Sequence, residues 1–138
     1  MNTETVFLLS NAFVIPAWVL LIFFSRHRIT EKIVYSGLWP FLLALMYLAA
    51  LIVALTQHVE LDFSSLEAIK NLFSTEWGVI TGWIHYLCFD LLVGIWIRKH
   101  SIKHSISSIV VIPSLIFTFL LGPIGWSVYL LNWYLKMK

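Results

Sequence analysis

The chain contains four apolar runs that are each long enough to cross a lipid bilayer, and this limits its fold more than any other feature. The runs cover about residues 6–25, 36–56, 77–97 and 106–134. A hydrocarbon core of about 30 Å needs roughly 20 helical residues, and a backbone in lipid must satisfy its own hydrogen bonds. The composition agrees, because 60% of the 138 residues are hydrophobic, 12% are charged and the mean hydropathy is +0.89. The sequence therefore predicts an all-α integral membrane four-helix bundle, with one transmembrane domain over residues 1–138.

The basic residues predict how this bundle is oriented. Six of them lie in the two short links, after the first and third runs: Arg26, Arg28, Lys32, Arg98, Lys99 and Lys103. The opposite side carries three: Lys70, Lys136 and Lys138. Cytoplasmic loops are enriched in Lys and Arg, so we expect both short links in the cytoplasm and both termini outside. The first run has no basic residue before it, so we expect it to remain as a membrane helix and not as a cleaved signal.

One segment outside the runs has a helical pattern of its own. In Leu61–Ser74, Ser64 followed by Glu67 is typical of a capping box at a helix start. Apolar residues then recur at helical spacing; they are Phe63, Leu66, Ile69, Leu72 and Phe73. The pattern predicts a short amphipathic helix on the outer membrane interface. Two interpretations remain open, a plain connector and a lid over a lateral entrance for a lipid-like ligand.

The fourth run has a helix-breaking sequence near its middle. It is roughly ten residues longer than a straight crossing needs, and it contains Gly122-Pro123-Ile124-Gly125. A proline inside a helix frees the carbonyl four residues earlier, so we expect the helix to be kinked or broken there. Close packing of small residues and a cavity wall with an exposed carbonyl both explain such a pattern.

Asp90 is the only acidic residue inside any of the runs, and His85 lies in the same run. An ionisable group at this depth costs roughly 2.5–3.5 kcal/mol on insertion scales, so these two residues define the candidate site. They are five positions apart, about 140° around a helix, and would bracket a ligand or contact different helices. Asp90 could hold helices together by hydrogen bonding. Alternatively, because burial disfavours a charged carboxyl, it could be a neutral proton donor, with His85 accepting the proton.

Other residues at similar depth could converge with this pair on one buried pocket. They are Asn11, Trp18, Tyr47, Trp83, Tyr86, Gly94, Thr118, Gly122 and Pro123. Other chemistries find little support in the sequence. His100 and His104 have a spacing that can hold a metal, but no third ligand is near them, so we expect no metal. No glycine-rich phosphate loop is present, and no inverted repeat indicates a transporter.

Several motifs occur in an order that resembles a known family. They are Asn11 with Pro16-Ala17-Trp18, Pro40 with Tyr47, the stretch from His85 to Ile97, and Pro113 with Gly122-Pro123-Ile124-Gly125 and Tyr129. Together they resemble the small membrane proteins similar to the plant abscisic-acid-deficient-four protein, which are associated with neoxanthin synthesis. This chain departs from the family pattern at Ile95, where we would expect an arginine. It has no transit-like extension, so it resembles a prokaryotic relative, expected in the inner (plasma) membrane.

The resemblance implies chemistry on a carotenoid or another polyisoprenoid lipid. The implied reaction is isomerisation of a xanthophyll epoxide to an allenic product, with no redox cofactor. Such a step needs an acid and a base in a dry cavity, and Asp90 and His85 would take these roles. The expected partner is a membrane lipid or carotenoid-like ligand and not a nucleic acid, and a homo-oligomer is compatible with the sequence. A non-catalytic scaffold or lipid-binding helper, and a proton-linked carrier, are the alternatives.

Overall fold

The computed structural model describes residues 2–137, and this part of the chain is helical with no strand. The helices are α1 (Thr3–Phe23), the π-helix η1 (Thr30–Tyr35), α2 (Leu38–Thr56), α3 (Leu66–Phe73), α4 (Glu76–Lys103), α5 (Ser108–Leu121) and α6 (Pro123–Met137). Three of them, α1, α2 and α4, are long and apolar enough to cross a membrane. They coincide with the first three apolar runs of the sequence.

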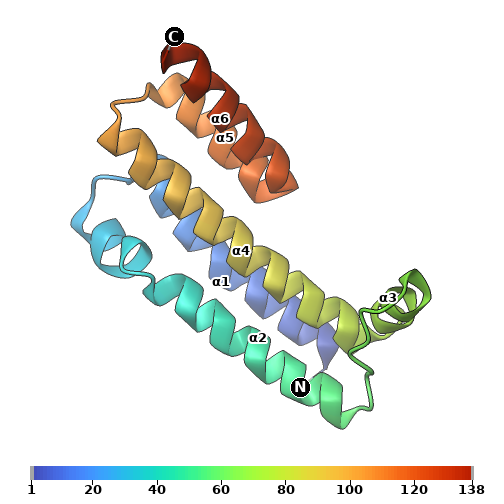
Figure 1. The fold of residues 1–138 in the computed structure, drawn as a ribbon. Coiled ribbons are helices and arrows are strands. Elements are labelled where there is room, and N and C mark those ends of the chain that lie inside the picture. Colours follow the sequence, from blue (N-terminus) through green and yellow to red (C-terminus); the bar gives the residue numbers. More distant parts are fainter. Residues whose placement is uncertain (1, 138) are drawn as a thin grey trace.

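Helix α4 is the centre of the molecule and contacts every other helix. Figure 1 shows it lying along α1 and α2, with the α5–α6 pair beside its carboxyl-terminal half. The core between these helices is apolar and includes Leu21, Leu43 and Leu91, which are fully buried. Many large apolar side chains point outward instead, as Ile109 does with 84% of its surface exposed. This outer surface suits contact with lipid tails.

The fourth apolar run forms a hairpin of two short helices. Helices α5 and α6 lie side by side and run in opposite directions (Figure 1), and Gly122 joins them. Gly122 has a φ of +45°, in the left-handed region that glycine adopts most easily. The 14 residues of α5 are about 21 Å long, which is shorter than a hydrocarbon core of about 30 Å. Three long helices and a hairpin thus replace the expected bundle of four crossing helices.

The hairpin also decides where the chain ends. Helix α6 returns along α4, so the ring of Trp133 lies 5.8 Å from that of His104. The amino-terminal end of α1 is at the other end of the bundle (Figure 1). We expected both termini on one side of the membrane, whereas in the structure the two ends of the described chain lie at opposite ends of the bundle (Figure 1), because the turn at Gly122 reverses the chain. Lys136, in the last turn of α6, therefore lies at the same end of the bundle as the two basic links (Figure 1).

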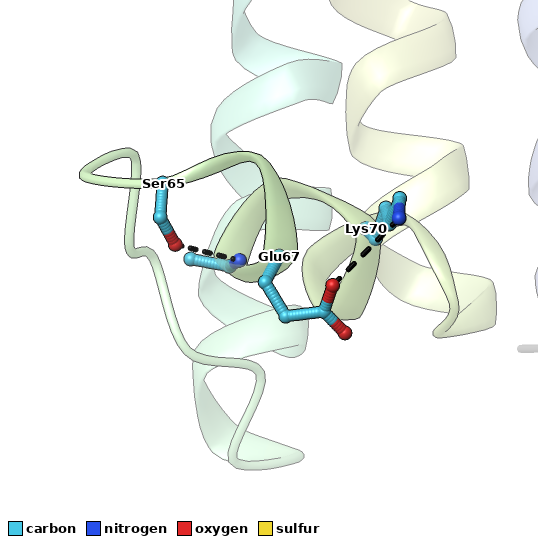
Figure 2. Close-up of polar contacts among 4 residues, drawn as sticks. Ser65, Glu67 and Lys70 are labelled. Atoms are coloured by element: carbon cyan, nitrogen blue, oxygen red, sulfur yellow. Dashed lines mark hydrogen bonds and ion pairs between the residues drawn. The ribbon is translucent and has the colours of Figure 1, made fainter.

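Helix α3 begins one residue later than the sequence indicated. Its cap is Ser65, whose hydroxyl accepts the backbone N–H three residues on at 3.1 Å (Figure 2). Ser64 instead donates its backbone N–H to Asp62 at 2.8 Å, and this bond lowers the pKa of that carboxyl. Glu67 lies in the first turn and pairs with Lys70 at 3.7 Å. Both side chains of this pair are exposed, so the pair adds little stability.

Two glycines of α4 allow α3 to lie close against it. A β-carbon on Gly82 would lie 2.5 Å from the ring of Phe73, and one on Gly78 would collide with the carbonyl oxygen of Leu72. Leu72 is buried in this contact, whereas Phe73 keeps half of its surface exposed. Helix α3 is therefore seated on the amino-terminal half of α4 through its last turn.

Candidate functional site

Asp90 faces protein and not lipid. Only 8% of its surface is exposed, and its Oδ1 lies 2.7 Å from where a β-carbon on Gly122 would be. The carboxyl group is thus placed against the turn of the α5–α6 hairpin. Its Oδ2 is buried without a hydrogen-bond partner among residues 2–137. Tyr86, one helical turn earlier on the same face, lies near the carboxyl group.

A second buried polar group lies close to this turn. Gly94 follows Asp90 by one turn of α4, and a β-carbon there would lie 2.6 Å from the indole ring of Trp18. That indole is 3% exposed and packs on Phe119 of α5 at a centroid distance of 5.3 Å. Its Nε1 makes no hydrogen bond within the described chain. Leaving a buried polar group unpaired costs about 1–3 kcal/mol, so this junction of α1, α4 and the hairpin is held together by packing.

His85 lies on a different side of α4. Its ring is exposed, stacks on Phe89 at 4.6 Å and faces Tyr47 of α2 at 5.7 Å. This follows from the angle of about 140° between positions five apart on a helix. The structure thus realises the second of the two options for this pair, in which Asp90 and His85 contact different helices.

An apolar groove lies beside His85, between α2, α4 and the covering helix α3. Its volume is about 370 Å³, within the usual size of small-molecule sites. Three side chains, Tyr47, Thr81 and His85, bring polar groups to it. Most of the other lining residues are apolar, among them Leu51, Ala54, Val59, Leu72 and Phe73. The groove combines a hydrocarbon-compatible wall with one imidazole and two hydroxyl groups.

Most of the expected pocket residues do not reach this groove. Asn11 accepts a hydrogen bond from the indole of Trp83 at 2.9 Å, which joins α1 to α4. Thr118 is fully buried and donates to the Ser114 carbonyl of its own helix at 2.8 Å. Pro123 is exposed at the start of α6. The expectation of one pocket that gathers all these groups is therefore wrong. The hairpin places its residues on the Asp90 side of α4, whereas α3 and α2 build the groove on the His85 side.

Comparison with known proteins shows the family to which the chain belongs. The sequence model described as ABA DEFICIENT 4-like matches residues 5–129, from α1 to the middle of α6. The chain belongs to the ABA DEFICIENT 4-like family. It is similar to Protein ABA DEFICIENT 4, chloroplastic, of Arabidopsis thaliana, with 25% identity over 112 residues that cover 76% of this chain. The chain spans about half (51%) of the length of that relative, and no solved structure matches it.

This ABA DEFICIENT 4-like protein has a polar cluster that the sequence did not single out. Arg98 is 9% exposed, and its guanidinium donates to the hydroxyl of Ser25 at 2.5 Å. Tyr35 donates to the Ser25 carbonyl at 2.8 Å. Burial raises the pKa of the Tyr35 phenol above its ordinary value, although the nearby guanidinium opposes this. In the sequence Arg98 follows the end of an apolar run as one basic residue of a short link, and no spacing pattern indicates its burial.

Proposed function

We propose that this protein binds a carotenoid-like polyisoprenoid lipid in the groove beneath α3. The observation that carries the proposal is an apolar groove beneath a short helix, lined by an imidazole and a phenol, between helices that are long and apolar enough to cross a membrane. A long hydrocarbon could enter such a groove sideways from the bilayer without crossing water. Membership of the ABA DEFICIENT 4-like family favours a carotenoid over other lipids of this shape.

The same groove could support an acid–base isomerisation. Opening of an epoxide breaks one carbon–oxygen bond, the oxygen gains a proton, and a nearby carbon loses one, so the product keeps the composition of the substrate. In our proposal Tyr47 gives the proton to the oxygen and His85 takes the proton from carbon. The ring centroids of these residues are 5.7 Å apart, and both residues line the groove.

Asp90 has a different part in this proposal from the one that the sequence suggested. It lies against the hairpin turn and does not line the groove, so we assign it to positioning the hairpin. This placement also favours a second candidate function, a lipid-binding protein without catalysis, in which the groove holds the lipid and no group acts on it.

Pigment analysis in a carotenoid-producing host separates these functions. The full chain and its His85→Gln variant are expressed in that host, and the pigments in the cells and bound to the purified protein are compared. Catalysis predicts a new isomer with the unchanged chain and a loss of about 100-fold or more in conversion with His85→Gln, in the range of general acid–base effects. The control is His104→Gln, at the opposite end of α4, which should keep full conversion.

Two other results of the pigment analysis would each decide between the candidate functions. A bound but chemically unchanged carotenoid would support the binding function and refute catalysis. If no polyisoprenoid is bound and no pigment changes, the proposal for the groove fails.

A further inference from the structure

A second cavity lies at the other end of the bundle, where the two basic links meet. Its volume is about 680 Å³, and it is bounded by the end of α1, the end of α4 and the start of α5. Its wall is polar and basic, with two arginines, one histidine and five serines among the lining residues, and it contains no acidic side chain. The cavity is separate from the groove beneath α3.

The deepest charged group in this wall is Arg98. It is 9% exposed, yet its positive charge has no carboxylate partner, because the one ion pair among the described residues joins Glu67 to Lys70. Its guanidinium donates to the hydroxyl of Ser25, while its Nε is buried and has no hydrogen-bond partner among the residues that the structure describes. Removing an arginine from water without a counter-charge is costly. An anion in the cavity would supply the missing charge and acceptors.

Backbone carbonyl oxygens near Arg98 already accept hydrogen bonds from hydroxyl groups. At the carboxyl end of α1, Thr30 donates its hydroxyl to the carbonyl of Phe24 at 2.6 Å, and Tyr35 donates to that of Ser25 at 2.8 Å. The chain therefore pairs the free carbonyls near Arg98 with hydroxyl groups, while Arg98 and Arg26 have no carboxylate partner among residues 2–137.

The start of α5 adds a further positive feature. Ser107 caps this helix, Ser108 begins it, and both line the cavity. The first turn of α5 contains no acidic residue, so no carboxylate offsets the partial positive charge at its amino-terminal end. Backbone N–H groups at such an end are typical ligands of phosphate groups.

We propose that this cavity binds a phosphate group through Arg98, Arg26, the serine hydroxyls and the start of α5. The phosphate could belong to the headgroup of an anionic lipid or to a free phosphate compound, since both offer the same oxygen acceptors and charge. Arg26 is exposed at the mouth of the cavity and Arg98 lies at its wall. The first would attract the anion and the second would form charge-assisted hydrogen bonds with it.

The experiment measures binding to the full chain purified in an uncharged detergent. Calorimetric titrations use inorganic phosphate, dihexanoyl phosphatidylglycerol, and dihexanoylglycerol, which has the same acyl chains without phosphate. We expect phosphatidylglycerol, inorganic phosphate or both to bind, and dihexanoylglycerol not to bind. Binding of inorganic phosphate identifies a free anion as sufficient, and binding of phosphatidylglycerol alone identifies a lipid headgroup.

Matched variants show whether the cavity is the site. Arg98→Gln should weaken binding about 10- to 100-fold, as expected for hydrogen bonds to a charged group. Arg26→Gln should weaken it about threefold, and the control Arg28→Gln, which removes the same charge from the same link but does not line the cavity, should leave it unchanged. If Arg98→Gln does not fold, the comparison of Arg26→Gln with Arg28→Gln decides whether the cavity is the binding site. Equal losses in those two variants, or no binding of either phosphate probe, would overturn the proposal.

Discussion

At the scale of single residues, three glycines allow close packing around Asp90 and beside the groove, because each leaves room for a larger neighbour. Gly122 accommodates the carboxyl of Asp90, Gly94 the indole of Trp18, and Gly82 the ring of Phe73. Small residues at helix contacts are usual in membrane proteins, because packing drives association where lipid competes with apolar side chains. Side chains of different chemistry thus depend on the same feature, a missing β-carbon on the facing helix or turn.

Gly122 provides a sharp test at this scale. In Gly122→Ala the new β-carbon would meet Asp90 at 2.7 Å, at a φ of +45° that disfavours alanine. Gly37→Ala is the matched control, because Gly37 has a φ of +85° but no atom within 4 Å of a β-carbon. We expect Gly37→Ala to lose roughly 1–2 kcal/mol from backbone strain, and Gly122→Ala to lose about 1–3 kcal/mol more from overpacking.

The measurement for this pair is the free energy of unfolding in detergent. Adding Asp90→Ala should remove part of the extra loss in Gly122→Ala, since the two side chains are in contact. Equal losses in the two glycine variants would show that Asp90 does not pack on the turn.

The sequence could predict the burial of Asp90 but not its neighbours. A lone carboxyl inside an apolar run is expensive in lipid, so it was expected to face protein. Which helix it meets depends on the reversal at Gly122, and a Gly-Pro pair is equally typical of a kink, a break and a tight turn. The separation of His85 from Asp90 followed from helical periodicity, whereas the groove beside His85 depends on how α3 is seated.

At the scale of elements, the short helix α3 is the part of the candidate site with the least support of its own. Eight residues are too few to form a stable helix in water, so α3 depends on its cap and on its contact with α4. Its amphipathic pattern was visible in the sequence. The cap was assigned one residue early, because Ser64 and Ser65 are adjacent and both precede Glu67 at a plausible spacing.

A cap substitution tests whether α3 behaves as this structure requires. Ser65→Ala removes the hydroxyl that accepts a backbone N–H and should destabilise α3 by about 1 kcal/mol. Ser64→Ala is the control and should have little effect, because its side chain does not cap the helix. Hydrogen exchange of the α3 amides should speed up about fivefold in Ser65→Ala only. Faster exchange in Ser64→Ala alone would show that Ser64, the position that the sequence indicated, caps the helix.

At the scale of the whole molecule, the hairpin changes how the charges are distributed. With α6 turned back, its last turn with Lys136 lies at the end of the bundle that carries the two basic links, and α3, which contains Lys70, lies at the other end (Figure 1). Positive charge concentrated on one side is typical of the cytoplasmic face. We therefore propose that both basic links and the carboxyl-terminal end of α6 lie in the cytoplasm, and that the amino-terminal end of α1 lies outside.

Cysteine labelling from each side of the membrane tests this arrangement. In a Cys88→Ala background, single cysteines replace Leu135, Lys103 and Gln57 in turn, and a membrane-impermeant thiol reagent is applied to vesicles of both orientations. The hairpin predicts that Leu135→Cys and Lys103→Cys are labelled from the same side and Gln57→Cys from the other. A fourth crossing helix predicts the reverse for Leu135→Cys, which would be labelled together with Gln57→Cys.

The central claim is that the groove beneath α3 holds a polyisoprenoid lipid. A substitution that fills the groove with a larger side chain tests this claim most directly. Leu51→Trp places a large ring at the groove wall, whereas Leu48→Trp places the same ring one turn away on the lipid-facing surface of α2. The measurement is the amount of carotenoid bound to each variant after purification from a carotenoid-producing host. We predict a loss of about tenfold, or about 1.4 kcal/mol, in Leu51→Trp and none in Leu48→Trp. Equal retention of carotenoid by both variants would contradict the claim.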